Sequence, residues 1–129
     1  MARTPQPTDA ELRLLKVLWE RGGSTARAVL EALPARRKVG YTTVLKILQV
    51  MEEKGLVSVD RGARSHVYSP RAGRGPTMRR LVADFVQRTF DGATDEMLVH
   101  LVDGRALDDA ALNELEARVA ALRGREEDR

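Results

Sequence analysis

The sequence predicts a mainly α-helical protein with one small β-hairpin, in which a winged helix-turn-helix precedes a helical region. Apolar residues recur at helical spacing in three segments before residue 56 and again after residue 75. Between them, residues 56–60 and 66–70 are rich in β-branched and aromatic side chains and flank a glycine-containing loop, "RGARS". Three helices followed by a two-stranded hairpin is the element order of a winged helix-turn-helix.

The first helix begins at "TDAE", where Thr8 and Glu11 can satisfy each other's backbone N–H groups in a capping box. The "RGG" at residues 21–23 ends this helix, because glycine favours a helix stop. The helical spacing of its apolar residues predicts a buried stripe of Leu12, Leu15, Leu18 and Trp19.

The second helix is capped by either Ser24 or Thr25 and ends at Pro34. A basic loop at residues 36–38 then leads to the third helix. The side chains of the second helix that we expect to point inward are Val29, Leu30 and Leu33.

The third helix is predicted to begin after Gly40 and to end at Gly55, because the residue past the last turn often needs a positive φ. One face is a core-facing stripe at helical spacing, formed by Val44, Ile47, Leu48 and Met51. The opposite face begins with small hydrogen-bonding groups and one cation, and its acid comes last: Thr42, Thr43, Lys46, Gln49 and Glu53. An ordinary solvated helix face is richer in Glu and Lys, so this face suggests a binding surface.

The predicted hairpin carries Arg61 and Arg64 on the two sides of its tip, and Pro70 ends its second strand. Residues 71–75, "RAGRG", are expected to form a flexible basic linker. The chain would therefore divide into a winged-helix domain with its linker, residues 1–75, and a helical dimerisation domain, residues 76–129.

The helical domain is predicted to contain three amphipathic stripes, with Asp108 capping the last helix and Gly124 ending it. Without a strand or a metal, a segment of this size buries too little surface to be stable alone, and symmetric pairing of two chains would bury all three stripes. A monomer whose tail folds back on the first domain is the alternative. The residues expected at the dimer interface are Leu81, Phe85, Met97, Leu101, Leu112, Leu115, Val119 and Leu122.

Charge is distributed unevenly along the chain. Residues 1–80 contain 16 lysines and arginines against 7 acids, a net charge of +9, whereas residues 81–129 have a net charge of −6. Such asymmetry indicates an anionic partner for the first part of the chain. The chain has no cysteine, no N-terminal signal pattern and no apolar run long enough for a bilayer, so we expect a cytoplasmic protein.

Double-stranded DNA fits these features as the anionic partner. In a winged helix the third helix enters the major groove, where short Thr side chains and a Lys can reach base edges. Acids near the phosphates would be repelled, so Glu52 and Glu53 are expected at the end pointing away from DNA. The phosphate backbone would be contacted by the start of the second helix, the start of the third helix and the wing: Ser24, Thr25, Arg27, Tyr41, Arg61 and Arg64.

The chain also resembles the penicillinase and methicillin-resistance repressors of the BlaI/MecI type, from about Asp9 to Leu122. The resemblance is carried by "ELRLLKVLWERGGSTARAVLEAL", "YTTVLKILQVMEEKGLV", "HVYSP" and "LDDAALNELEARV". It implies a homodimeric repressor that binds an inverted-repeat operator. The family's base-facing and neighbouring positions fall on Thr42, Thr43, Leu45 and Lys46; some members have a cation where this chain has Leu45, so operator preference cannot be copied. The absence of cysteine argues against the family's copper-sensing branch.

The resemblance further implies a way of switching the repressor off, through a protease or a sensor antirepressor as partner. Members that respond to β-lactams are cleaved between an Asn and a Phe in the C-terminal region. Laying the sequences together without gaps puts that bond at His100–Leu101, with an imidazole in place of the amide. The alternative is that Leu101 simply packs in its apolar stripe.

Two other classes of function compete with DNA binding. An enzyme is disfavoured, because the two histidines, His66 and His100, lack a second ligand or a triad partner at a useful spacing, and no cofactor motif is present. A winged helix that binds a protein, without sequence-specific DNA binding, is an alternative that the sequence leaves open.

Overall fold

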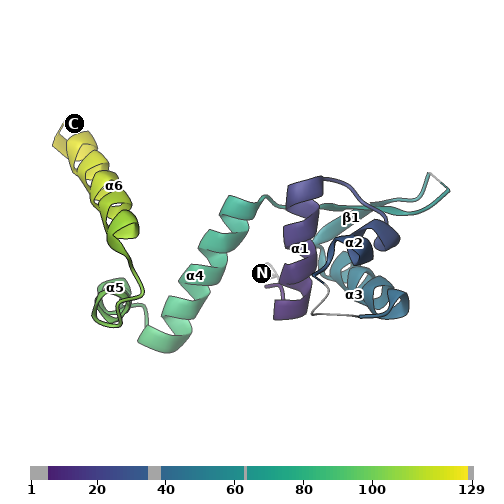
Figure 1. The fold of residues 1–129 in the computed structure, drawn as a ribbon, viewed down its shortest axis with the longest axis horizontal. Helices are drawn as coiled ribbons and strands as arrows, with labels where there is room; N and C mark the ends of the chain where they lie inside the picture. The colour runs from purple at the N-terminus through teal and green to yellow at the C-terminus, as the bar shows by residue number, and fades with distance from the viewer. Residues whose placement is uncertain (1–5, 35–38, 63, 128–129) are drawn as a thin grey trace. The chain divides into compact units, whose positions relative to one another are not determined.

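The computed structural model describes residues 6–34, 39–62 and 64–127, and the predicted basic loop at residues 36–38 lies outside these ranges. The elements follow the predicted order (Figure 1). They are α1 (Asp9–Arg21), α2 (Ala26–Ala32), α3 (Tyr41–Lys54), β1 (Val57–Asp60), β2 (Val67–Pro70), α4 (Arg74–Phe90), α5 (Thr94–Asp103) and α6 (Asp109–Glu127).

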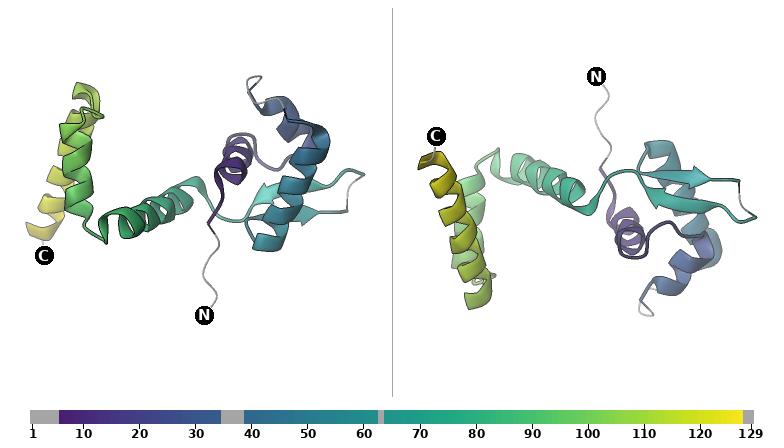
Figure 2. Two further views of the ribbon diagram at one scale, coloured as in Figure 1. Left: turned by 90° about the horizontal axis from the view of Figure 1, so that it is seen from below. Right: turned by 90° about the horizontal axis from the view of Figure 1, so that it is seen from above.

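The chain forms two compact units, Met1–Leu81 and Val82–Arg129, so the division falls inside α4. The first unit packs α1, α2 and α3 against one another and against a two-stranded antiparallel sheet. This is the predicted mainly helical fold with one hairpin, arranged as a winged helix. The hairpin from Val57 to Pro70 is the wing, and it extends beyond α3 (Figure 2).

The core of the first unit is aliphatic, apart from Tyr68. Its largest fully buried side chains come from α1, α2, α3 and β1: Leu18, Val29, Val44, Leu48, Met51 and Val57. The predicted stripe of α1 is wrong at Leu12, which is only half-buried, whereas Leu14 is 3% exposed. The buried face of α1 runs through Glu11, Leu14, Leu15 and Leu18, which also share a helical spacing.

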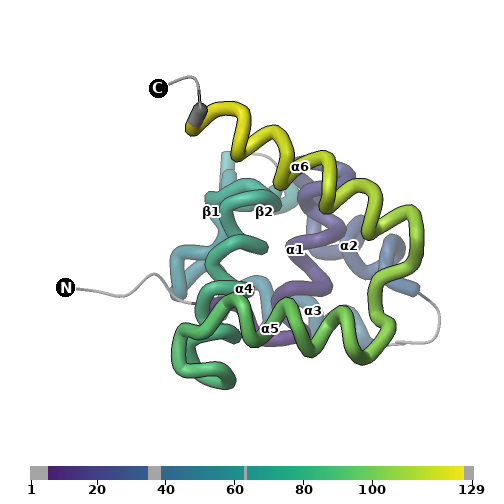
Figure 3. Tube along the Cα trace, turned by 90° about the vertical axis from the view of Figure 1, so that its left-hand side faces the viewer, coloured from purple at the N-terminus to yellow at the C-terminus, as the bar shows by residue number. Residues whose placement is uncertain are grey.

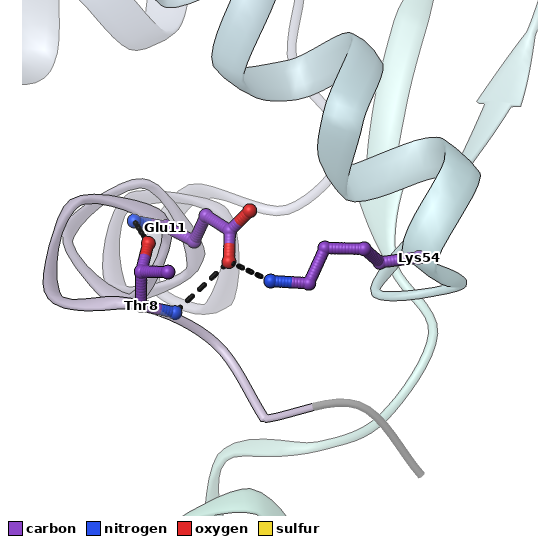
Figure 4. A network of polar contacts seen from close by, with 3 residues as sticks. All are labelled: Thr8, Glu11 and Lys54. Carbon is purple, nitrogen blue, oxygen red and sulfur yellow. Dashed lines mark hydrogen bonds and ion pairs between the residues drawn. The ribbon is translucent and has the colours of Figure 1, made fainter. Parts of the chain in front are cut away.

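Glu11 is a buried polar residue on the inward face of α1. Its carboxylate accepts the backbone N–H of Thr8 at 2.9 Å, which completes the predicted capping box, and it accepts Lys54 Nζ from the end of α3 at 2.5 Å (Figure 4). The Glu11 side chain is 6% exposed and that of Lys54 is 28% exposed. Burial alone would raise the pKa of Glu11, but the hydrogen bonds from Lys54 and Thr8 outweigh burial and lower the pKa.

The structure shows which of Ser24 and Thr25 caps α2. Thr25 caps α2, since its side chain accepts the N–H of Ala28 at 3.1 Å. Ser24 instead pairs with Tyr68 of β2 through two backbone hydrogen bonds of 2.8 and 2.9 Å. Gly40 precedes α3 and Gly55 ends it with a φ of 81°, as predicted from the sequence.

The wing pairs Val57 with Pro70 at its base and Asp60 with Val67 toward its tip. The turn between α1 and α2 lies close against β2. A methyl group added to Gly23 would meet Ser69 Oγ at 2.8 Å and Val67 Cγ1 at 3.1 Å. Glycine at this position therefore lets the turn approach β2 closely enough to anchor the wing to the helices.

The segment predicted as a flexible linker is partly helical, because α4 begins at Arg74 and not at Pro76. Trp19 Nε1 donates to the carbonyl of Ala72 at 2.9 Å, and the N–H of Arg71 donates to Leu56 O at 3.0 Å. Thr77 is 3% exposed, and its hydroxyl donates to the carbonyl of Gly73. These bonds attach the first turns of α4 to the winged unit.

In the second unit, α5 and α6 are joined by a short turn (Figure 3). Asp108 caps α6 as predicted, since its carboxylate accepts the N–H of Ala111 at 2.8 Å. The predicted stop at Gly124 is wrong, because α6 continues to Glu127; glycine costs a helix only about 1 kcal/mol and does not break it. Over residues 82–126, Val86 alone is buried, so α4, α5 and α6 pack loosely on one another.

Replacing Glu11 with Gln tests the ion pair without removing the cap. The variant should lose about 1–2 kcal/mol of unfolding free energy near neutral pH, because Lys54 loses a charged partner in a mostly buried place. Glu20→Gln is the matched control on the same helix, since Glu20 is exposed. Urea unfolding of both variants and the wild type measures the difference.

The difference in unfolding free energy between the wild type and Glu11→Gln should depend on pH in one direction. Because folding lowers the pKa of Glu11 below 4.5, its contribution is present above that pH and is lost as the pH falls through the folded value. The gap between wild type and Glu11→Gln should therefore close on acidification. A gap that stays constant, or an equal loss in Glu20→Gln, would contradict a stabilising role for this ion pair.

Candidate nucleic-acid interface

The outer face of α3 presents Thr42, Thr43 and Lys46, all exposed. Directly opposite, Val44 and Leu48 are completely buried. The burial of one face therefore fixes the direction of the other. A helix that projects two hydroxyls and one ammonium group at its N-terminal end offers hydrogen-bond donors and acceptors to a partner.

One edge of α3 borders an open depression between α2, α3 and the wing. Its volume is about 470 Å³, and its lining includes five of the predicted site residues beside others that the prediction did not include. The lining residues are Thr25, Ala26, Arg27, Tyr41, Leu45, Gln49, Arg64, Ser65, His66 and Tyr68. The fold thus brings residues that are some 40 positions apart into one polar surface with two arginines.

Arg27 and Tyr41 form the contact between α2 and the start of α3. The guanidinium carbon of Arg27 lies 4.9 Å from the centroid of the Tyr41 ring, within the range of a cation–π interaction. Both side chains are exposed, so the ring holds the cation in place without removing it from solvent. Leu45, predicted beside the base-facing residues, is half-buried and packs against the core at the edge of the depression.

The wing arginines differ in their surroundings. Arg61 Nη2 donates to Glu52 Oε1 at 2.6 Å, and this hydrogen bond lowers the pKa of Glu52 and raises that of Arg61. Arg64 lies on the depression with Arg27 and Tyr41. The sequence placed both arginines on the DNA backbone and gave no sign that one of them pairs with α3.

Ser24 occupies a different environment from its neighbour Thr25. It is 8% exposed, its hydroxyl donates to the carbonyl of Gly22 at 2.9 Å, and its N–H donates to Tyr68 O. Both of its donors are therefore engaged inside the protein, and we leave Ser24 out of the candidate interface.

Ser65 and His66 were not predicted as site residues, although they lie on the depression. From the sequence, His66 was expected at the start of a strand, and only a metal-binding or catalytic role was considered for it. Its position directly after the wing tip, two residues from Arg64, could have suggested that it lies near the depression. A strand prediction alone does not show this, because it does not specify which side of the wing faces α3.

Within residues 6–34, 39–62 and 64–127, no three His, Asp or Glu side chains gather as metal ligands. In the same ranges no helix is both long and apolar enough to cross a bilayer.

Most of the residues predicted for a dimer interface are exposed in the single chain. Leu81, Met97 and Leu112 are half-buried, and Leu122 is 60% exposed. The other four are 37–45% exposed: Phe85, Leu101, Leu115 and Val119.

Comparison with known proteins identifies the family. The family model described as penicillinase repressor matches residues 7–121, which is most of the chain. The chain belongs to the penicillinase repressor family. Its relatives include the transcriptional regulator BlaI of Mycobacterium tuberculosis, with 39% identity over 91% of this chain and 90% of the relative. The penicillinase repressor of Bacillus licheniformis is 24% identical over 89% of this chain and 90% of the relative.

A solved structure of a family member supports the fold of the first unit. The solution structure of the DNA-binding domain of the repressor BlaI matches with a TM-score of 0.50 and 27% identity. The match covers 57% of this chain and 90% of that domain. The family and these relatives are repressors and regulators, so the expectation that this chain is not an enzyme is confirmed.

Proposed function

We propose that this DNA-binding transcriptional repressor recognises an inverted-repeat operator as a homodimer. The observation that carries the proposal is the outer face of α3, with Thr42, Thr43 and Lys46 next to a depression that holds Arg27 and Arg64. The named function of the family and of its relatives agrees with it.

The outer face of α3 is suited to base reading. A major groove about 12 Å wide admits one α-helix, and its base edges offer acceptors, donors and the thymine methyl group. Short threonine side chains bring their hydroxyl and methyl groups close to these edges, and Lys46 reaches further to a guanine acceptor. Leu45 would lie at the margin of this contact, where a half-buried apolar side chain can meet a thymine methyl.

The depression is suited to the sugar–phosphate backbone next to the groove. Arg27 from α2 and Arg64 from the wing bring positive charge to its lining, and Thr25 and Tyr41 add polar groups. A phosphate strand that follows this surface would meet cations from α2 and from the wing at once. Contacts of this type fix the orientation of α3 and carry no sequence information.

Dimerisation is proposed from the second unit. Its helices bury almost nothing within one chain, and α6 carries a groove lined by Leu115, Val119 and Ala120 with Glu116 and Arg123 at its sides. Exposed apolar side chains that gather on one helix face are suited to contact with another protein surface. A second copy would cover it symmetrically and would bring two recognition helices to successive major-groove faces, about 34–36 Å apart.

Inactivation by proteolysis at His100–Leu101 is proposed as the switch. The bond lies in α5, which has no buried residue, and the side chains of His100 and Leu101 are 66% and 37% exposed. The His100 ring contacts Phe90 with centroids 5.6 Å apart, and little else holds the helix. In an unpaired chain, a helix with so few buried contacts opens at low cost, which is what a protease needs. Cutting there would separate the winged unit from α6.

The first prediction concerns base reading. Thr42→Ala and Lys46→Ala should each weaken binding to a selected operator by about 1–3 kcal/mol, because each removes a base contact. Binding to random duplex should fall much less. Lys16→Ala is the matched control, since Lys16 is an exposed cation on α1 outside the depression. Fluorescence anisotropy with both duplexes measures the losses.

The result that would contradict base reading is an equal loss on operator and random DNA for Thr42→Ala and Lys46→Ala. If Lys16→Ala lost as much affinity as Lys46→Ala, the net charge of the protein would explain the effect, and the position of Lys46 would not matter. A wild-type protein with no salt-sensitive binding to any duplex would favour the protein-binding alternative.

The second prediction concerns assembly. Val119→Asp should convert a dimer into a monomer in sedimentation, because an unpaired carboxylate in a buried apolar interface costs several kcal/mol. Asn113→Asp is the control, since it adds the same charge to an exposed position on α6. Operator affinity should fall sharply only in Val119→Asp, while the thermal unfolding of the winged unit stays unchanged. A Val119→Asp protein that remains dimeric would exclude this face of α6.

The third prediction concerns the switch. Intact-mass measurement on protein from inducer-treated cells should find fragments that end at His100 and begin at Leu101. The winged fragment should bind operator far more weakly than the whole chain, because its two half-site contacts are no longer linked. Full-length protein together with derepressed target genes would point to another trigger.

A further inference from the structure

Of the two arginines at the wing tip, one forms an ion pair with α3 and the other lines the depression. Arg61 directs Nη2 at Glu52 Oε1, 2.6 Å away. In the part of the chain that the structure describes, no ion pair reaches Arg64, which lines the depression beside Arg27 and Tyr41. Arginines separated by only two residues therefore differ in the net charge that they bring to the interface.

Glu52 lies on the edge of α3 that faces the wing. It follows Leu45 by seven residues and Gln49 by three, and both of those residues line the depression. Arg61 comes directly after β1, and the next turn is held by Asp60, whose carboxylate accepts the N–H of Gly62 at 2.8 Å. The Glu52–Arg61 pair therefore connects the recognition helix to the wing at a point where the wing backbone is itself fixed.

Phosphate would have to compete with Glu52 for Arg61. A guanidinium–carboxylate pair has no net charge as a whole, so it displaces few counterions from the DNA when the protein binds. If Arg61 turned away to a phosphate, the Glu52 carboxylate would lose its hydrogen-bond partner on α3 while DNA is bound. The loss of this bond opposes the exchange by a modest amount, since the side chains of Arg61 and Glu52 are 55% and 31% exposed.

We propose that Glu52 is a positioning residue of the DNA interface. Its ion pair with Arg61 connects α3 to the wing, and phosphate binding at the wing tip is left to Arg64. This inference rests on the proposed function. It assigns the two wing arginines to different tasks, one that fixes the angle of the wing and one that binds the DNA backbone.

The experiment measures the salt dependence of affinity for a duplex that the wild-type protein has selected from a random pool. Arg64→Ala should lower the slope of log K against log salt by about 0.9, the value for one phosphate contact. Arg61→Ala should leave the slope unchanged, because the paired arginine displaces few counterions. Arg61→Ala and Glu52→Gln should each lower affinity about two- to fivefold. The double variant should be no weaker than either single one, because both changes remove the same ion pair.

Glu53→Gln controls for the removal of an acid near DNA, since Glu53 is exposed on the same helix turn. Glu52→Gln should bind more weakly than Glu53→Gln although both carry the same net charge. A positioning role also predicts a coupling between two variants. Arg64→Ala should cost less affinity in the Glu52→Gln background, where Arg64 is no longer well placed. A general loss of protein stability would not produce that coupling, and thermal unfolding of each variant checks that it is folded.

Two results would overturn the proposed positioning role of the Glu52–Arg61 pair. In the first, Arg61→Ala lowers the slope as much as Arg64→Ala does. In the second, Glu52→Gln binds more tightly than Glu53→Gln with a steeper slope, so that Glu52 masks a phosphate-binding Arg61. Either result leaves the proposed function intact. A wild-type protein that selects no duplex would overturn both the proposed function and this inference.

Discussion

The burial of one stripe of α3 determines most of the first unit. Val44, Leu48 and Met51 are all 0% exposed, held by side chains of α1, α2 and β1. Because successive helix residues turn by about 100°, fixing this stripe inward forces Thr42, Thr43 and Lys46 outward. Gly55 then ends α3, and β1 starts two residues later. The direction of the binding face is thus a consequence of a single packed stripe.

Local chemistry explains which features were predictable from the sequence. The capping box of Thr8 and Glu11, the stop at Gly55 and the cap at Asp108 each depend on groups within a few residues, and the structure has all three. Leu14 was missed, because the inward face of α1 is set by packing against residues of α2, α3 and β1, which lie far away in the sequence. The early start of α4 has a similar cause. Trp19 holds Ala72 across 53 residues, and no pattern within "RAGRG" contains that information.

In the candidate site, too, local features were predictable from the sequence and long-range contacts were not. The sequence identified the outer residues of α3 and the cations near it, because helical spacing and charge are local properties. It could not assign a different environment to Arg61 and Arg64, since only the folded wing brings Arg61 to Glu52. Nor could it separate Ser24 from Thr25. Both residue types make good caps, and the choice depends on the backbone pairing between Ser24 and Tyr68.

The sparse burial in the second unit has a consequence for the cell. Over residues 82–126 a single side chain, Val86, is buried, so one chain supplies little of the free energy that would hold α5 and α6 in place. If a second copy supplies the rest, the order of these helices depends on the copy number of the protein. The concentration of paired chains then rises with the square of the free-chain concentration at low abundance. Repression would weaken more than proportionally when synthesis slows, so dosage itself becomes a control on the regulated genes.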